Sequence, residues 1–338
     1  MSGEARKTVL VTGCAGFVGS FLCARLLCEE NLRVVGLDNM YSYYDIELKR
    51  ERLAMVQEAA SGSFELVRAD VDDADAVEEV FVTYQPDVVV HLAAQAGVRY
   101  SLEAPRVYVK ANVSGFLNVL EACRNHPVKH LVYASSSSVY GLNEKTPFSE
   151  QDKTDRPASL YAATKKAGEL MAHAYAHTFG VPSTGLRFFT VYGPMGRPDM
   201  AYYKFALLMK AGKPIQIYNG GNMLRDFTYV GDVVEGIRLV VARALEDPVG
   251  EEPVCRLYNL GHGSPVRLMD FVSTLEERLL AHGVISEPPV HELLPMQPGD
   301  VTQTYADTSA FQRDFGFVPQ TSYEEGLDRF AEWFSKHE

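Results

Sequence analysis

The first 190 residues alternate between short apolar runs and longer stretches with helical spacing. Residues 8–12 form a continuous apolar run, as a strand buried on both faces should, and residues 17–30 follow with helical spacing. The same pattern predicts strands at 33–37, 64–69, 87–92, 130–134 and 183–189, and helices at 46–60, 74–84, 106–124 and 161–179. Regular alternation of strand and helix is typical of right-handed βαβ units. We therefore predict an α/β fold with a doubly wound parallel sheet.

After residue 189 the pattern becomes less regular, and Gly and Pro cluster at 193–198, 212–214 and 220–221. Helices are predicted at 232–245 and 267–281, with a strand at 255–260 between them. We interpret residues 1–189 as a cofactor-binding domain with a return segment near 228–260. Residues 190–338 are interpreted as a smaller C-terminal α/β lobe that binds substrate and is interleaved with the first domain.

Charge narrows the possible partners. Hydrophobic residues make up 46% and charged residues 22% of the 338 residues, which is ordinary for a globular protein and excludes a disordered or collagen-like chain. The 32 Lys and Arg against 44 Asp and Glu give a net charge of −12. Binding to nucleic acid or to an anionic membrane surface needs a basic face, so neither partner is expected. The same charge would repel anionic small molecules at long range.

The five cysteines predict neither a disulfide framework nor a zinc site, because their number is odd and no Cys-x-x-Cys pair occurs. Reduced thiols in a reducing compartment are the simplest interpretation, and no metal is expected. Arg6 and Lys7 precede an apolar stretch that superficially looks like a signal peptide, but three glycines and Arg25 interrupt it. No run approaches 18 apolar residues. We expect a cytoplasmic protein without a transmembrane helix.

Three evenly spaced glycines join the first predicted strand to the first helix. The segment TGCAGFVG places them at Gly13, Gly16 and Gly19. A turn between strand and helix must be tight to let the backbone approach a pyrophosphate, and the helix N-terminus then offers N–H groups to the phosphates. Such glycines also occur in ordinary turns, but this position favours a Rossmann-type dinucleotide site.

Two acidic residues follow the next strands. Asp38 ends the second strand, where a carboxylate can bind the adenine ribose hydroxyls and would repel a 2′-phosphate. It therefore favours NAD over NADP, although an Asp before Asn39 can also form a turn. Asp70 follows the third strand, from which it could reach the adenine or simply cap the next helix.

A tyrosine and a lysine lie four residues apart in the helix predicted at 161–179. This spacing puts Tyr161 and Lys165 on one helix face, where the ammonium lowers the pKa of the phenol from about 10 and makes it a base near neutral pH. A surface pair is the alternative. The serine-rich segment SSSSVY at 135–140 follows the fifth strand and places hydroxyls where parallel sheets bind ligands, unless it is only a polar turn.

Together, TGxxGxxG, HLAA at 91–94, the serines before VYG at 139–141 and YxxxK resemble the extended short-chain dehydrogenase/reductase family of nucleotide-sugar enzymes. Three further segments look like UDP-glucuronate 4-epimerases: LRFFTVYGPMGRPDM at 186–200, RDFTYVGDV at 225–233 and DNMYSYYD at 38–45. The resemblance covers nearly the whole chain in several separate blocks.

The resemblance implies roles at matching positions. Ser136 would hydrogen-bond the sugar C4 oxygen, Tyr161 would act as base and acid, and Lys165 would bind the nicotinamide ribose and tune the tyrosine. Phe188 would pack near the nicotinamide, where many relatives have a tyrosine, so a hydroxyl role is absent. The expected NAD contacts are Gly13, Gly16, Phe17, Val18, Gly19, Asp38, Asn39, Asp70, Val71, Leu92, Ala93, Ala94, Tyr161, Lys165 and Phe188.

The resemblance also implies how an acidic sugar nucleotide would be held. Thr190 and Arg197 match positions that bind the glucuronate carboxylate, and Arg225 matches an arginine that pairs with the diphosphate. Taken alone, Arg197 could be a surface residue and Arg225 part of a buried ion pair. Asp300 matches a uridine-ribose contact, but Gln297 stands where related hexose epimerases often have Arg. The expected substrate contacts are Arg99, Ser136, Ser137, Ser138, Tyr161, Thr190, Arg197, Arg225 and Asp300.

The implied activity is that of a UDP-glucuronate 4-epimerase, which interconverts UDP-glucuronate and UDP-galacturonate by transient C4 oxidation with bound NAD, a 4-keto intermediate and hydride return to the opposite face. A 4-epimerase of UDP-glucose, UDP-galactose or an N-acetylhexosamine is the first alternative and a UDP-glucuronate decarboxylase the second. A non-catalytic NAD sensor would have no use for the Tyr161–Lys165 pair. A 4,6-dehydratase is disfavoured because the segment before Val139 contains serines and no acidic pair.

A homodimer is expected, since helices 106–124 and 161–179 pack into an intersubunit four-helix bundle in the resembling family. Leu117, Leu120, Leu170 and Tyr175 suit such a face, but they equally suit packing on the sheet. The sequence leaves this choice open.

Overall fold

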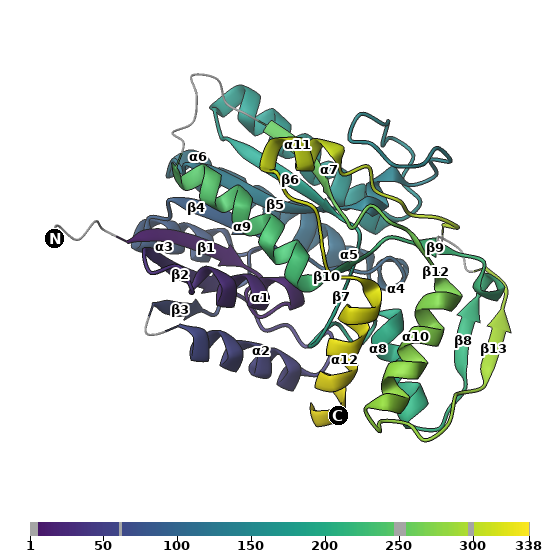
Figure 1. Cartoon of the computed structure of the whole chain (residues 1–338). Helices are drawn as coiled ribbons and strands as arrows, with labels where there is room; N and C mark the ends of the chain where they lie inside the picture. The colour runs from purple at the N-terminus through teal and green to yellow at the C-terminus, as the bar shows by residue number, and fades with distance from the viewer. Residues whose placement is uncertain (1–5, 61–62, 247–254, 297–300, 338) are drawn as a thin grey trace. The chain divides into compact units, whose positions relative to one another are not determined.

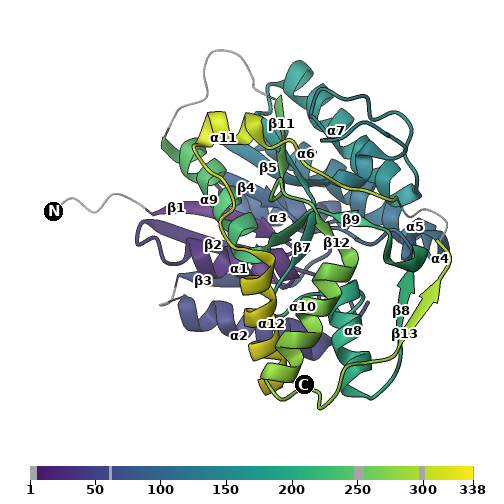
Figure 2. The ribbon, with the colours of Figure 1, turned by 45° about the vertical axis from the view of Figure 1, so that its right-hand side comes forward.

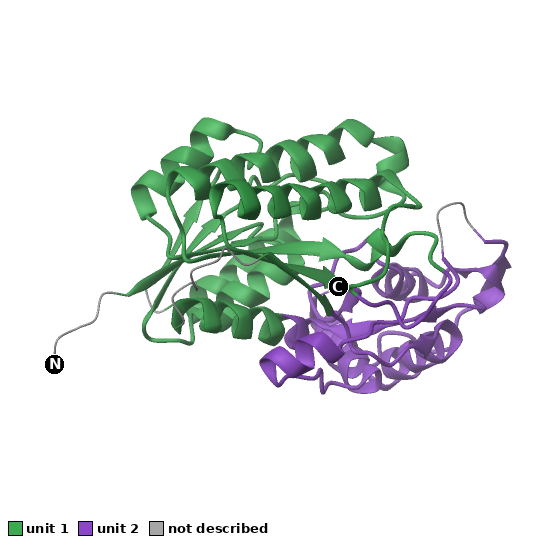
Figure 3. Cartoon of the chain, turned by 90° about the horizontal axis from the view of Figure 1, so that it is seen from above, with its two compact units in different colours: residues 1–143, 150–188, 234–259 green, residues 144–149, 189–233, 260–338 purple. Residues whose placement is uncertain are grey.

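The computed structural model describes residues 6–60, 63–246, 255–296 and 301–337. The chain divides into two compact units, drawn in different colours in Figure 3. The first unit holds residues 1–143, 150–188 and 234–259, and the second holds 144–149, 189–233 and 260–338.

The first unit is built on a seven-stranded sheet with the order β11-β6-β5-β4-β1-β2-β3 (Figure 1). Its strands are β1 Lys7–Thr12, β2 Leu32–Leu37, β3 Phe64–Val67, β4 Val88–His91, β5 His130–Ser136, β6 Ser183–Phe188 and β11 Cys255–Leu260. Neighbouring strands from β3 to β6 pair in parallel. The strand order reverses between β1 and β4, which is where open parallel sheets bind ligands. The predicted α/β class and parallel sheet are confirmed.

Helices cover both faces of this sheet (Figure 3). The helices that lie wholly or mainly in the first unit are α1 Phe17–Leu26, α2 Ile46–Ala59, α3 Ala74–Tyr84, α4 Tyr100–Glu103, α5 Pro105–Val109, α6 Gly115–Asn125, α7 Leu160–Phe179 and α9 Val230–Glu246. Apolar residues of α3, α6 and α7 share one core with β1 and β5. Local chemistry sets the helix ends: the side chain of Ser159 accepts the N–H of Ala162 at the start of α7, and Gly180 ends that helix in the left-handed conformation.

The single helix predicted at 106–124 is interrupted. A π-helical turn, Lys110–Ser114, separates α5 from α6. Within it, the Asn112 side chain accepts the Gln95 N–H at 2.8 Å and donates to the Gln95 carbonyl at 3.0 Å and to Thr164 Oγ1 at 3.0 Å. These tertiary bonds fix the loop after β4 to α7, and an inserted turn at such a place is a common feature of functional sites.

The second unit combines short strand pairs with helices around an aromatic core. Its elements are β7 Thr190–Tyr192, α8 Ala201–Lys210, β8 Ile215–Tyr218, β9 Leu224–Arg225, β10 Phe227–Tyr229, β12 Val266–Arg267, α10 Leu268–Ala281, β13 His291–Leu294, α11 Ser309–Phe315 and α12 Tyr323–His337. Strand β8 lies beside β13 (Figures 1 and 2). The rings of Phe227 and Phe271 stack with centroids 3.7 Å apart. The helices predicted at 232–245 and 267–281 are confirmed, whereas the short strands were not predicted.

No helix in the described part of the chain is both long and apolar enough to span a membrane.

His91, at the end of β4, is a buried polar residue whose pKa is shifted by its surroundings. Its ring stacks on Phe116, and its Nδ1 lies 2.9 Å from Thr12 Oγ1. Burial, followed by the nearby charge of Lys165, lowers the pKa of His91 to about 3. The imidazole is therefore neutral in the folded protein at pH 5.

This buried histidine predicts acid sensitivity. The unfolded state binds a proton near pH 6.5 and the folded state does not until about pH 3, so stability is lost as pH falls through this window. His91 should lower the free energy of unfolding by about 2 kcal/mol between pH 7 and pH 5. Urea unfolding of the wild type and of His91→Asn at both pH values isolates this contribution. Equal pH dependence in the two proteins would contradict it.

Candidate active site

The glycine turn lies where the strand order reverses. Gly13 has φ +73° and donates to the Leu37 carbonyl at 2.7 Å, while Gly16 donates to the Gly13 carbonyl at 2.9 Å. A Cβ atom on Gly19 would lie 2.1 Å from the Gly13 oxygen, and one on Gly13 would lie 2.7 Å from the Ala93 nitrogen. The turn is therefore as tight as the backbone allows. Because the cap residue Gly16 has no side chain, it leaves the first N–H groups of α1 to another partner.

Thr12, the first residue of the TGxxGxxG motif, fixes the segment after β4 to this turn. The Thr12 carbonyl accepts the Leu92 N–H at 3.1 Å, and Thr12 Oγ1 accepts the Ala93 N–H at 3.2 Å. Predicted contacts from two strand ends, Gly13 after β1 and Leu92–Ala94 after β4, are thus brought together.

Asp38 is buried at the end of β2 with its carboxylate largely engaged. Its Oδ2 accepts the Ala15 N–H at 3.1 Å, and its Oδ1 accepts the Met40 N–H at 2.8 Å and lies 3.3 Å from Lys49 Nζ. A carboxylate offers about four acceptor positions, so capacity for a ribose hydroxyl remains. Lys49 balances the charge that was expected to repel a 2′-phosphate, so that repulsion is weaker than the sequence alone implied.

Helix α2 supplies a second buried cation. Arg52 Nη1 donates to the Ala15 carbonyl at 3.3 Å and to the Tyr44 hydroxyl at 2.5 Å. Lys49 and Arg52 are three residues apart and reach the same turn from one face of α2. The sequence analysis did not predict either residue. The signal that could have shown them is two cations three residues apart on the buried face of the helix that follows Asp38.

The expected adenine-side residues lie together. Asn39 Nδ2 donates to Asp70 Oδ2 at 3.1 Å, and Asp70 Oδ1 accepts the Asp72 N–H at 3.1 Å. Val71 is buried in the apolar core. Phe17 is also buried and its ring contacts Phe21 edge-on.

The Tyr161–Lys165 pair is placed by the first turns of α7. Lys165 Nζ donates to the Ala134 carbonyl at the end of β5, at 2.9 Å. Burial lowers the pKa of Lys165 to about 8. The ring of Tyr161 meets that of Tyr108 edge-on at 6.1 Å, and the Tyr108 hydroxyl donates to the Gly97 carbonyl at 2.6 Å. Tyr161 is therefore packed beside the loop that follows β4.

The serine segment begins inside the sheet. Ser136 is the last residue of β5 and lies opposite Phe188 in the register with β6. Ser136 Oγ accepts the Ser138 N–H at 3.2 Å, so it caps the 3₁₀ turn Ser137–Tyr140. The polar-turn interpretation and the catalytic one are compatible, because a hydroxyl that accepts one bond still has its own hydrogen to donate.

The expected carboxylate and diphosphate residues belong to the second unit. Arg197 holds Asp199 with two bonds, from Nε to Oδ1 at 3.0 Å and from Nη2 to Oδ2 at 2.5 Å. Arg225 donates to the carbonyls of Val301 at 2.6 Å and Thr302 at 3.2 Å. The backbone N–H of Thr190, in β7, donates to the Asp226 carbonyl at 3.1 Å.

Of the two remaining expected substrate contacts, Arg99 is described by the structure and Asp300 is not. Arg99 stands at the N-terminal end of the short helix α4 in the first unit. Asp300 and the neighbouring Gln297 lie outside the described residues.

The glycine turn gives a test of cofactor binding. Gly19→Ala would force a Cβ against the Gly13 carbonyl and open the turn, so we expect NAD binding to weaken at least about tenfold, or 1.4 kcal/mol. Gly180→Ala is the matched control, since it has φ +72° with nothing within 4 Å of its Cβ and should cost only about 1–2 kcal/mol of stability. NAD released from the purified, denatured proteins measures the difference. Equal NAD content in both variants would refute this role of the turn.

Two sequence relatives cover nearly the whole chain. A Rhizobium meliloti protein described as a probable UDP-glucuronate 4-epimerase is 47% identical over 339 residues, covering 97% of this chain and 97% of its own. UDP-glucuronate 4-epimerase 2 of Arabidopsis thaliana is 48% identical over 336 residues, covering 97% of this chain and 75% of its own.

Solved structures of nucleotide-sugar 4-epimerases also match nearly the whole chain. UDP-glucuronic acid 4-epimerase from Bacillus cereus, in complex with UDP-glucuronic acid and NAD, matches with a TM-score of 0.87 and 32% identity, over 97% of this chain and 99% of its own. The UDP-glucose 4-epimerase of Thermus thermophilus, in complex with NAD, matches with a TM-score of 0.82 and 29% identity, over 98% and 99%. The family model for the NAD dependent epimerase/dehydratase family matches residues 9–261. This chain therefore belongs to the NAD dependent epimerase/dehydratase family.

Proposed function

We propose that this protein is an NAD-dependent UDP-glucuronate 4-epimerase. The observation that carries the chemistry is the position of Lys165, one helical turn after Tyr161, whose ammonium donates to the Ala134 carbonyl two residues before Ser136. Relatives described as UDP-glucuronate 4-epimerases, at 47% and 48% identity over nearly the whole chain, support the substrate. We propose that the first unit binds NAD and that the second binds the sugar nucleotide.

The chain's own residues would perform the proton transfers. When bound, NAD supplies reversible hydride transfer that oxidises the C4 alcohol to a ketone and reduces it again. Tyr161 takes the proton of the 4-hydroxyl and returns it, with Lys165 stabilising the phenolate. Ser136 donates its hydroxyl hydrogen to the C4 oxygen and holds it in place. Epimerisation then requires the keto sugar to present its other face before C4 is reduced.

The glycine turn and Asp38 fit a dinucleotide. The turn excludes a Cβ at Gly13 and Gly19, as close approach to a pyrophosphate requires. Asp38 keeps acceptor capacity at the end of β2, where a ribose would bind. Phe188, beside Ser136 in the sheet, is the expected neighbour of the nicotinamide.

Arg197 supports an acidic substrate over a neutral one. Oxidation at C4 makes UDP-glucuronate a β-keto acid, which loses CO₂ when the breaking bond aligns with the carbonyl π-system. A planar guanidinium that binds a carboxylate through two bonds can keep it out of that alignment. Arg197 already binds the Asp199 carboxylate in this manner. The same restraint on a substrate carboxylate would favour epimerisation over decarboxylation.

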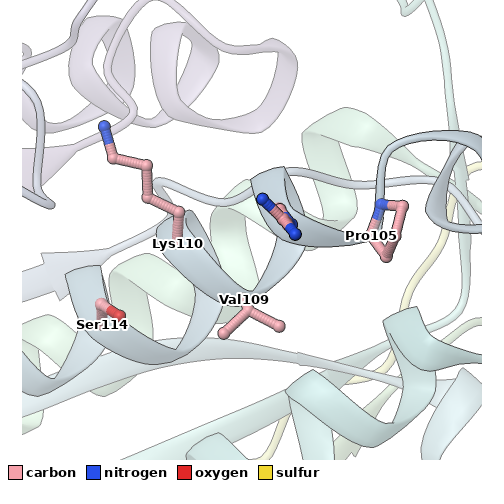
Figure 4. Close-up of a pocket in the computed structure, with 5 residues that line it drawn as sticks. Pro105, Val109, Lys110 and Ser114 are labelled. Atoms are coloured by element: carbon pink, nitrogen blue, oxygen red, sulfur yellow. The ribbon is translucent and has the colours of Figure 1, made fainter.

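We also propose a homodimer through α5, α6 and α7. The sequence did not decide whether four apolar residues face a partner subunit or the sheet. Leu120 is fully buried and Tyr175 packs on the core, whereas the side chains of Leu117 and Leu170 are 39% and 59% exposed. A pocket on α5 and the π turn, shown in Figure 4, is lined by Pro105, Arg106, Val109, Lys110 and Ser114. Exposed apolar side chains on helices of one face favour a partner helix.

We further propose a cytoplasmic location. All five cysteines are free thiols, and three of them are buried. A reducing compartment keeps such thiols unpaired.

The central experiment follows UDP-glucuronate by NMR with purified protein. We expect UDP-galacturonate without accumulation of NADH, because the hydride taken at C4 is returned in each turnover. Tyr161→Phe should retain NAD and lose at least about 100-fold in kcat, the usual contribution of a positioned base. Stoichiometric CO₂ would instead identify a decarboxylase. Unchanged activity in Tyr161→Phe would remove the proposed base.

Arg197→Ala tests the choice of substrate. Without the Arg197 guanidinium, the substrate carboxylate would lie beside the unneutralised Asp199 carboxylate, which predicts a roughly 10- to 100-fold lower kcat/KM for UDP-glucuronate. Any turnover of UDP-glucose should be unaffected, since that sugar has no carboxylate. Parallel assays with both substrates give the comparison, and Arg225→Ala should weaken both. A wild type that prefers UDP-glucose would favour the UDP-glucose 4-epimerase alternative.

A further inference from the structure

A buried carboxylate lies directly behind the proposed catalytic residues. Glu169 is on α7, one turn after Lys165, and its side chain is 1% exposed. Its Oε1 accepts the hydroxyl of Ser135 at 2.7 Å. Ser135 is the neighbour of Ser136 in β5, and Ala134, on its other side, accepts Lys165. Two side chains one helical turn apart thus bind consecutive residues of β5, which fixes the register of α7 along the strand.

An equally buried arginine holds Glu169 in place. Arg187, opposite Ser135 in β6, donates from Nε to Oε1 at 2.8 Å and from Nη2 to Oε2 at 2.9 Å. Lys166 adds a contact to Oε2 at 3.2 Å. Burial alone would raise the pKa of Glu169, but the bonds from Arg187, Ser135 and Lys166 outweigh it and the pKa lies below its usual value. Glu169 is therefore ionised at neutral pH.

Arg187 also holds the far end of the serine turn. Its Nη1 donates to the Tyr140 hydroxyl at 3.0 Å, and that hydroxyl donates to Asn259 Oδ1 at 2.6 Å. Its guanidinium carbon lies 4.9 Å from the Tyr140 ring centroid. The segment from Ser135 to Tyr140 is thus bound at both ends by one ion pair. Ser136, between these anchors, has little freedom to move relative to α7.

Stability is a weak reason for such a pair. The desolvation of two buried charges offsets most of their attraction, and apolar replacements are often as stable. What an apolar pair would not supply is the directional bond to Ser135. The position of Ser136 relative to Tyr161 is the property that depends on that bond.

We propose that Glu169 is a positioning residue: held by Arg187, its carboxylate fixes the Ser135–Ser136 end of β5 against α7 and so sets the Ser136 hydroxyl relative to the Tyr161 phenol. This role rests on the proposed function, because it concerns the geometry of the C4 proton transfer. Glu169 touches neither substrate nor cofactor in it and acts through Ser135 and α7.

Ser135→Ala removes the bond while leaving the Glu169–Arg187 pair intact. Small displacements of reacting groups reduce rates strongly, so we expect kcat with UDP-glucuronate to fall about 10- to 100-fold, with KM and NAD content within about twofold. Ser183→Ala is the matched control, another buried serine, at the start of β6, whose hydroxyl bonds Cys255. It should keep the kcat of the wild type. Ser135→Thr restores a hydroxyl and should recover most of the activity.

The charge pair needs its own variant because Glu169→Gln leaves Arg187 buried without a counter-charge and can unfold the protein. The double variant Glu169→Met with Arg187→Met removes both charges. We expect it to fold and bind NAD, with a kcat at least as low as that of Ser135→Ala. Full kcat in the double variant, or equal kinetics in Ser135→Ala and Ser183→Ala, would overturn the proposal.

An NMR measurement that does not depend on catalysis tests this proposal separately from the proposed function. In NAD-loaded protein labelled at tyrosine Cζ, the Tyr161 signal is the one missing in Tyr161→Phe. We expect it to shift in Ser135→Ala and to stay in place in Ser183→Ala. If the wild type does not epimerise UDP-glucuronate but this shift occurs, the proposed substrate fails and the positioning role stands. An unmoved signal in Ser135→Ala rejects the positioning role, whatever the activity.

Discussion

The close approach of backbone segments at the reversal point of the sheet is the constraint on which the rest depends. Gly13 leaves no space for a Cβ against Ala93, and Gly19 leaves none against the Gly13 carbonyl. Only glycines allow β1 to turn into α1 at this spacing and the segment after β4 to lie beside it. Thr12 then joins the two segments through its hydroxyl. The neighbouring strand ends follow from the parallel register, which brings Asp38 and Ser136 to the same edge.

Two carboxylates buried at this edge are each paired with a cation. Lys49 accompanies Asp38, and Arg187 accompanies Glu169. An unpaired charge in such positions would be costly, whereas a hydrogen-bonded pair can be retained for orientation. Each pair joins a helix to a strand next to a proposed functional residue. The Asp38–Lys49 pair therefore orders the region of the expected ribose, and the Glu169–Arg187 pair orders the region behind the expected C4 atom.

The sequence predicted what local pattern encodes. Apolar runs such as 8–12 located the sheet, and the glycines and Tyr161–Lys165 predicted which of its edges is the functional one. Elements determined by tertiary bonds were missed. The π turn depends on Asn112, whose partners are 17 and 52 residues away. The strand pairs of the second unit are too short to show periodicity, and Glu169 looks like a surface residue until Ser135 and Arg187 are placed beside it.

Net charge and local charge lead to different conclusions about the substrate. At −12 the chain should repel an anionic sugar nucleotide at long range, and the arginines proposed to bind it already have partners. Arg197 binds the Asp199 carboxylate. A glucuronate carboxylate bound there would exchange one carboxylate for another, so its affinity would be the difference between two similar pairs. Such an exchange gives modest binding energy but defined geometry, because the planar guanidinium binds a carboxylate through two parallel bonds. That balance suits a reaction in which the carboxylate must be oriented more than it must be tightly held.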